Sequence, residues 1–245
     1  MNIDFSFIKT YCQVSPDDVE NMVIDFPATD LLDITKTEQL LKKLKTLYQA
    51  HDLLLPVSVV GLSLFGLLGT QWIVLSQPKK SLYLPLNDVQ LQVGLFTEST
   101  PFVTLKIQEV TLVEPCNLIE YVQEHLTAPI ETIAQAGDVK SSLIYNQFGA
   151  RATSLVEGFM QYETNPTVQA TCNAFFRELK EDTSWRRNPF LYDPVYIDNP
   201  YAPGSQTMMR SSCCMFYRRK NGVKCYNCPT LSVKEREKMA QQLNK

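Results

Sequence analysis

The spacing of apolar residues predicts a helical N-terminal part. Four leucines between residues 40 and 47 recur at helical spacing, with lysines between them on the opposite face. Upstream, Ser15-Pro16-Asp17-Asp18 has the order of a helix start, with a capping serine, a proline at the first helical position and acids in the first turn. We therefore expect mostly helix before residue 50.

The middle third changes to the alternating pattern of half-buried strands. Apolar and polar residues alternate over residues 89–95 and again over residues 103–108. We interpret residues 72–75 and 82–84 as two further strands. Because the connections are short and parallel pairing needs a longer crossover, the pattern predicts a small antiparallel sheet at about residues 71–113.

Helical spacing returns near residue 116 and continues to about residue 182. One helix is marked by residues 119–126, a second runs from a cap at Asp138 to Phe159, and a third begins at Thr167. Prolines alternate with aromatic residues over 185–204, which predicts an extended segment, because proline excludes helix. A charged helix over residues 234–243 ends the pattern.

Together these elements predict an α+β fold that is mostly helical, with a small antiparallel sheet and a cysteine-rich loop near the C-terminus. We expect an α+β body over residues 1–204 and a C-terminal cysteine-bearing segment with the final helix over residues 205–245. A chain of 245 residues is long enough to bury a core without a metal ion. The cysteine-rich loop is therefore expected to be functional.

The longest apolar stretch, residues 53–68, is interrupted by Pro56, Gly61 and Gly66 and is shorter than the ~20 residues that cross a bilayer. We expect a buried core segment, with a peripheral membrane contact as the alternative. The chain opens without the basic and apolar regions of a signal peptide, and its seven cysteines fit a reducing compartment. The expected location is the cytoplasm, with at most peripheral association with the inner membrane.

Charge and glycine patterns argue against two classes of function. The net charge of -3 and the pI near 5.5 disfavour a dedicated nucleic-acid binder. The glycines match neither the dinucleotide-binding order nor a P-loop, so the chain has no recognisable site for NAD(P)H or ATP. If the protein handles electrons, they come from another protein or a diffusible reductant.

Four of the seven cysteines, Cys213, Cys214, Cys225 and Cys228, form a C-C-x10-C-x2-C cluster. Four thiolates are a complete ligand set for a [2Fe-2S] cluster or for zinc. The second pair has zinc-site spacing, but adjacent cysteines diverge and do not easily reach one small ion, whereas a two-iron cluster relaxes that constraint. The spacing favours [2Fe-2S]; a zinc site and, last, disulfides remain alternatives.

The same segment resembles the C-terminal part of the FhuF-like siderophore-iron reductases. The resemblance lies in Ser211-Ser212-Cys213-Cys214-Met-Phe-Tyr-Arg and in Cys225-Tyr-Asn-Cys228-Pro229. Weaker similarity lies in residues 142–149 and in Arg187-Asn188-Pro189, so that the resemblance extends over most of residues 50 to 230. The first fifty residues resemble no recognisable segment, and the sequence leaves their role open.

This resemblance implies a cytosolic ferric siderophore reductase that binds [2Fe-2S] through the four cysteines. The activity implied is one-electron reduction of siderophore-bound Fe(III), which hard oxygen ligands hold more tightly than Fe(II). The implied partners are a ferric siderophore and an external electron donor such as a ferredoxin or a flavin reductase system. The alternatives are a zinc-stapled interaction or regulatory module, a cluster-based redox or iron sensor and, last, a role in siderophore biosynthesis.

Charge around the cysteines is one-sided, because residues 199–233 contain no Asp or Glu. Such a surface attracts an anionic chelate or an acidic ferredoxin, although the same cations could simply offset the charge of the cluster. Trp185 and Tyr217 are further candidates for chelate binding. The candidate docking cations are Arg186, Arg187, Arg210, Arg218, Arg219, Lys220 and Lys224.

The other metal-ligating residue types lack ligand spacing. His51 and His125 are far apart in the sequence and are interpreted as ordinary histidines. Cys12, Cys116 and Cys172 are expected to be buried thiols, a common environment for free cysteine.

Overall fold

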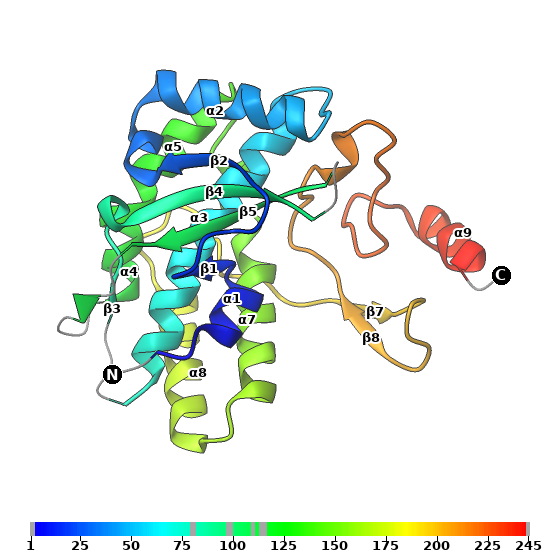
Figure 1. Ribbon diagram of the computed structural model, residues 1–245. Helices are drawn as coiled ribbons and strands as arrows, with labels where there is room; N and C mark the ends of the chain where they lie inside the picture. Colours follow the sequence, from blue (N-terminus) through cyan, green and yellow to red (C-terminus); the bar gives the residue numbers. More distant parts are fainter. Residues whose placement is uncertain (1–2, 79–81, 97–99, 109–110, 113–116, 244–245) are drawn as a thin grey trace.

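The computed structural model describes residues 3–78, 82–96, 100–108, 111–112 and 117–243 (Figure 1). Its α-helices are α1 (Phe5–Tyr11), α2 (Ile34–Leu47), α3 (Leu54–Ser76), α4 (Leu118–Tyr121), α5 (Thr127–Ala136), α6 (Ser142–Tyr145), α7 (Phe148–Tyr162), α8 (Pro166–Glu181) and α9 (Val233–Leu243). Its strands are β1 (Val14–Ser15), β2 (Met22–Pro27), β3 (Leu82–Tyr83), β4 (Val89–Leu95), β5 (Pro101–Ile107), β6 (Thr111–Leu112), β7 (Tyr196–Asp198) and β8 (Gln206–Met208). The predicted α+β class is confirmed.

Helix α3 is the centre of the molecule (Figure 1). It packs against helices α1, α2, α5, α7 and α8 and against strand β5. Although α3 is long and apolar enough to cross a membrane, 89% of its apolar window is buried inside the protein. A Cβ at Gly66 would overlap the carbonyl oxygen of Cys12, so this glycine lets the end of α1 approach α3 closely. The predicted buried core segment is confirmed.

The prediction of a strand at residues 72–75 is wrong, because α3 continues to Ser76. Trp72 is fully buried and its indole N–H donates a 3.0 Å hydrogen bond to the carbonyl oxygen of Cys172 on α8. A helix buried on all sides shows no apolar periodicity, and a short apolar run of this kind cannot be distinguished from a buried strand by sequence pattern.

The main sheet lies across one side of α3 and has the strand order β1-β5-β4-β2 (Figure 1). The alternating residues predicted as strands form the antiparallel pair β4 and β5, with Val93 opposite Val103. Their inward residues, including Leu91 and Leu105, are fully buried. The sheet is mixed and not purely antiparallel, because β1 pairs with β5 in parallel, Val14 opposite Leu105.

Both of the remaining strands of this sheet, β1 and β2, come from the part of the chain that was predicted to be helical. The helix start at Ser15 is wrong: Ser15 lies in β1, and its hydroxyl accepts the N–H of Asp17 at 3.0 Å in a turn. This is the hydrogen bond of a helix cap, but here the chain turns and continues into β2. The leucine-rich helix predicted at residues 40–47 is confirmed as α2.

The long helix predicted to follow Asp138 is two helices, α6 and α7, separated at Asn146 and Gln147. Asp138 has φ of 52° and lies in the turn after α5, so it caps neither helix. The helices predicted near residues 119–126, from Thr167 and over residues 234–243 are confirmed as α4 with the π-helical turn Val122–Leu126, α8 and α9.

After α8 the chain leaves the helical body and forms an extended C-terminal arm (Figure 1). Strands β7 and β8 pair as an antiparallel hairpin, the cysteine loop follows, and α9 ends the described chain. The proline-rich segment is largely irregular, as its composition predicts. The division of the chain into two domains at residue 204 stays a prediction.

Candidate iron-sulfur site

All four cysteines of the C-terminal cluster line one cavity of about 350 Å³. Cys213 and Cys228 are buried, and Cys214 and Cys225 are half-buried, so the cavity has an inner and an outer pair of thiols. The loop therefore gathers in space the residues that were selected from the sequence.

The inner pair already has the spacing of two ligands on one metal ion. The Sγ atoms of Cys213 and Cys228 are 3.6 Å apart. Two thiolates bound to one tetrahedral ion at about 2.3 Å would be separated by about 3.8 Å. Within the described ranges, no three His, Cys, Asp or Glu side chains are arranged around a single ion position. Four thiols around one cavity, two of them at ligand spacing, fit a [2Fe-2S] cluster.

The backbone of the loop shapes this arrangement locally. Met215 follows the adjacent cysteines with φ of 59°, a left-handed conformation that reverses the chain, and its N–H donates to the sulfur of Cys213. Cys228 donates its N–H to the carbonyl oxygen of Cys225 at 3.0 Å, which closes a turn and keeps both thiols of this pair on the cavity.

The thiols differ in how easily they ionise. Burial raises the pKa of Cys213 to about 11 and also raises the pKa of Cys225. Burial acts in the same direction on Cys228, but hydrogen bonds from the hydroxyl and backbone N–H of Thr230 outweigh it and lower its pKa. Of the two inner cysteines, Cys228 is therefore the one that forms a thiolate more easily, and the thiolate is the form that binds metal.

Ser211 fixes the start of the loop at the break between α6 and α7. Its hydroxyl donates to the carbonyl oxygen of Asn146 at 2.7 Å and accepts the N–H of Ala150 at 3.1 Å. These backbone groups are four residues apart, so the hydroxyl takes the position of a bond within a helix. A side chain inserted in this way breaks or bends a helix. The same contact thus explains the break and anchors the cysteines.

Two more side chains hold the loop. The hydroxyl of Ser58, in the core helix α3, accepts from the amide of Gln147 at 3.0 Å and donates to the carbonyl oxygen of Cys214 at 2.9 Å. Arg236 of α9 donates to the carbonyl oxygens of Tyr226 and Cys228, each at 3.0 Å. The loop is therefore bonded to the body on one side and to the last helix on the other.

Two arginines lie at the outer cysteines. The guanidinium of Arg151, on α7, is close enough to Cys214 and to Arg210 to interact electrostatically with both. Arg210 in turn interacts with Cys225. Burial is the main cause that lowers the pKa of Arg151, and the neighbouring Arg210 adds to it. No ion pair with a carboxylate is formed by Arg151 or Arg210 within the part of the chain that the structure describes.

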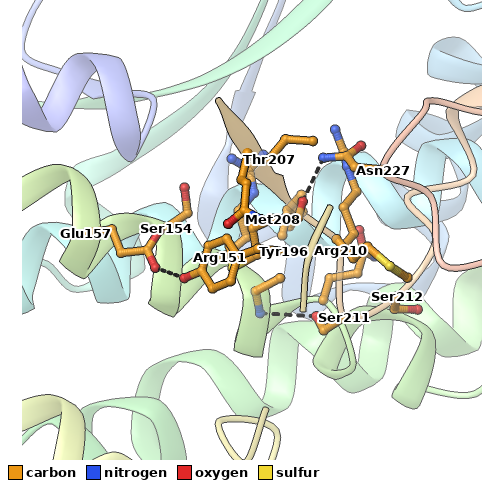
Figure 2. A pocket seen from close by; sticks show the side chains of 15 residues that line it. Arg151, Ser154, Glu157, Tyr196, Thr207, Met208, Arg210, Ser211, Ser212 and Asn227 are labelled. Carbon is orange, nitrogen blue, oxygen red and sulfur yellow. Dashed lines mark hydrogen bonds between the residues drawn. The ribbon is translucent and has the colours of Figure 1, made fainter. Parts of the chain in front are cut away.

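A second cavity of about 340 Å³, drawn in Figure 2, adjoins the first. It lies between α7 and the β7–β8 hairpin and shares Leu62, Arg151 and Arg210 with the cysteine cavity. Its other polar lining includes Glu157, whose carboxylate accepts a hydrogen bond from the hydroxyl of Tyr196. This bond raises the pKa of Tyr196 to about 12.

The predicted docking cations separate into two groups. Arg210 and Lys224 line the cysteine cavity, together with Tyr217. Arg218 forms an ion pair with Asp52, and Arg219 stacks on the ring of Phe216 at 4.2 Å.

The remaining candidates lie away from the cysteines. The exposed residues Arg186, Arg187 and Lys220 line neither cavity. Trp185 packs against Tyr145 and Phe190 in the body.

The thiols outside the cluster are buried as predicted where the structure describes them. Cys12 and Cys172 are 4% and 0% exposed, and burial raises the pKa of each to about 12. Cys116 lies outside the described residues. His51 is exposed, and the ring of His125 packs between Tyr83 and Tyr121.

Sequence reasoning missed Ser58, Asn146 and Arg236, whose hydrogen bonds hold the cysteine loop, and Arg151, which interacts electrostatically with Cys214. Arg151 had a visible signal, because it is a lone cation between Ala150 and Ala152 on the mostly apolar helix α7. The others act through backbone carbonyls or their own backbone, and no residue pattern marks such contacts.

The comparisons with known proteins agree with the location of the site. The family model described as the FhuF 2Fe-2S C-terminal domain matches residues 210–229, a range that contains all four cysteines. This match confirms the resemblance to the FhuF-like family and supports iron-sulfur binding at the cavity. No curated protein matches the chain.

Proposed function

We propose that this chain, an FhuF-like protein by its C-terminal domain, reduces siderophore-bound Fe(III) to Fe(II) by one electron and so loosens iron from the chelate. The observation that carries the proposal is the cavity lined by Cys213, Cys214, Cys225 and Cys228, inside the segment matched by the 2Fe-2S domain model. A [2Fe-2S] cluster held there supplies a one-electron carrier. The Fe(III) chelate takes that electron, and an external donor such as a ferredoxin or a flavin reductase system restores it.

The unequal burial of the four thiols supports an electron path through the two more exposed cysteines. Cys213 and Cys228 are 6% and 1% exposed and face the protein interior, whereas Cys214 and Cys225 are half-buried. The outer pair is therefore the shortest route between a bound cluster and a substrate at the surface. Arg151 and Arg210 stand beside this pair and would stabilise negative charge there.

Reduction as a release step follows from the chemistry of the substrate. Hydroxamate, catecholate and carboxylate oxygens are hard ligands that bind Fe(III) more tightly than the softer Fe(II). The electron transfer itself requires no acid or base from the protein. The residues of the site need only hold the carrier, exclude water from its inner side and attract the chelate.

A single-turnover experiment tests the proposal. Protein reduced with dithionite and freed of excess reductant is mixed anaerobically with a ferric siderophore, and the visible spectrum and trapped Fe(II) are followed together. We expect the cluster spectrum to return to the oxidised form as one Fe(II) appears per cluster oxidised. A protein that stays reduced in the presence of ferric siderophores, while ferricyanide still oxidises it, would be a sensor or a carrier for another acceptor.

A further inference from the structure

We propose that the polar cavity between α7 and the β7–β8 hairpin binds an anionic oxygen-donor group of the ferric chelate, with Arg151 and Arg210 as its anchors. This inference rests on the proposed function and names the part of the surface that takes the substrate. Figure 2 shows the cavity, with Arg151 and Arg210 among the side chains that line it.

The two arginines stand between the cysteines and the polar cavity. Each of them lines both cavities. On the cysteine side, Arg151 interacts with Cys214 and Arg210 with Cys225. A ligand on the other side of the guanidiniums is therefore separated from the outer cysteines by one layer of side chains. That position suits electron transfer without direct contact.

The positive charges of Arg151 and Arg210 favour an anionic ligand in the polar cavity. The guanidiniums of Arg151 and Arg210 are close enough to repel each other, and Arg151 is half-buried. In the described part of the chain, neither forms an ion pair with Asp or Glu. Each guanidinium is positively charged and carries several N–H donors, so it can donate hydrogen bonds to the lone pairs that the oxygens of a carboxylate, hydroxamate or catecholate do not use to coordinate Fe(III).

Neutral polar groups complete the lining. Ser154 on α7 and Ser212 and Asn227 of the cysteine loop line the same cavity. The single carboxylate of the lining, Glu157, is bonded to the hydroxyl of Tyr196. Two guanidiniums against one carboxylate leave the lining net positive. A volume of about 340 Å³ that opens to solvent holds one chelating arm while the rest of the chelate stays outside.

Two variants test the cavity without touching the arginines or the cysteines. Ser154→Leu fills the cavity from the α7 side. Glu157→Gln removes the one negative charge from its lining. Arg219→Gln is the matched control, because Arg219 stacks on Phe216 and lines neither cavity. Each variant is used as the full chain in the oxidised, cluster-loaded state, checked by its visible spectrum.

The measurement is equilibrium binding of two ferric probes, an anionic tris-catecholate complex and a neutral tris-hydroxamate complex. For the anionic probe we expect binding at least about tenfold weaker in Ser154→Leu and about threefold tighter in Glu157→Gln, as one nearby charge in a partly solvated site gives. Neutral-probe affinity is expected to be unchanged in Glu157→Gln. Arg219→Gln is expected to stay within about twofold of the parent for both probes.

Several outcomes would overturn this assignment. Unchanged binding in both cavity variants, or an equal loss in Arg219→Gln, would mean that the chelate binds elsewhere. No binding of either probe to the parent protein would also reject the cavity, while cluster oxidation by ferric siderophore could still establish the reductase activity. Conversely, normal probe binding without any cluster oxidation would keep the cavity and reject the reductase.

Discussion

The hydroxyl of Ser211 donates a 2.7 Å hydrogen bond to the carbonyl oxygen of Asn146 and so joins the cysteine loop to the break between α6 and α7. Sixty-five residues of chain separate these partners. Because the same hydroxyl accepts the N–H of Ala150, it satisfies two backbone groups at once.

Replacing Ser211 by Ala is expected to destabilise the protein. Both the carbonyl of Asn146 and the N–H of Ala150 would lose their partner, and because the two hydrogen bonds are only partly buried we expect a loss of about 1 kcal/mol. The measurement is the urea unfolding midpoint of cluster-loaded protein. The control is Ser212→Ala, which removes a hydroxyl one residue away and is expected to change the free energy of unfolding by less than about 0.5 kcal/mol. Equal midpoints in the two variants would mean that the hydroxyl of Ser211 does not anchor the cysteine loop.

The four-cysteine ligand set makes a second prediction. Cys225→Ser or Cys228→Ser is expected to abolish most visible absorption above the protein band, because a hydroxyl is a poor ligand for a cluster held by thiolates. Cys172→Ala removes a fully buried thiol on α8, outside the cysteine cavity, and is expected to leave iron and sulfide content unchanged. Iron and acid-labile sulfide are counted in all three proteins. Loss of the cluster in Cys172→Ala alone would overturn the ligand assignment.

Arg151 is expected to raise the reduction potential of the cluster. Reduction adds negative charge, which a nearby guanidinium stabilises, so Arg151→Gln should lower the midpoint potential by on the order of 50 mV. The measurement is a mediated redox titration followed by visible absorption. Arg219→Gln, which removes a charge outside both cavities, is expected to shift the potential by much less. Equal shifts in both variants would show a general surface charge effect.

The ion pair between Arg218 and Asp52 gives a prediction with a defined pH dependence. The hydrogen bond from Arg218 lowers the pKa of Asp52 below its ordinary value of 3.8. The ion pair therefore contributes fully to the stability of the folded protein above about pH 4. This contribution is lost as the pH falls through the lower pKa that Asp52 has in the folded state.

Asp52→Asn should therefore cost less than about 1 kcal/mol at pH 7, since both side chains are partly exposed. The difference between parent and variant should narrow as the pH falls below 3.8, the ordinary value. Urea unfolding midpoints of the parent and Asp52→Asn proteins at pH 7, 4 and 3 would measure this difference in stability. A difference that grows toward acid would mean that the pair does not stabilise the fold.

The sequence predicted a helix or strand correctly where the pattern of apolar residues within that element was enough to identify it. The alternating residues of β4 and β5 and the leucines of α2 gave correct elements, because the apolar residues recur at the period of each element, every second residue in the strands and every third or fourth in the helix. Ser15 misled, because its hydroxyl makes the hydrogen bond of a helix cap inside a turn. The strand predicted at Trp72 was wrong, because a helix that is buried on all sides has no exposed face and so shows no helical alternation of apolar and polar residues.

The site divides in the same way. The cysteine spacing predicted the gathering of the four thiols, since these residues are close in sequence and belong to a family motif. Ser58 could not be found, because it reaches the loop from α3 only once the chain has folded, and Arg151 was marked only as a lone cation on α7, with nothing in the sequence to place it beside Cys214. Arg218 was selected for docking from its charge alone, and its pairing with Asp52, 166 residues away, was invisible in the sequence.

The most direct test of the account is the visible and EPR spectrum of anaerobically purified protein before and after dithionite reduction, with iron, zinc and acid-labile sulfide counted on the same sample. We expect equal iron and sulfide, in the proportion of one [2Fe-2S] cluster per chain, and an S = 1/2 signal in the reduced state alone. A colourless protein that contains one zinc ion per chain and no sulfide would contradict the account, because it would have no electron carrier.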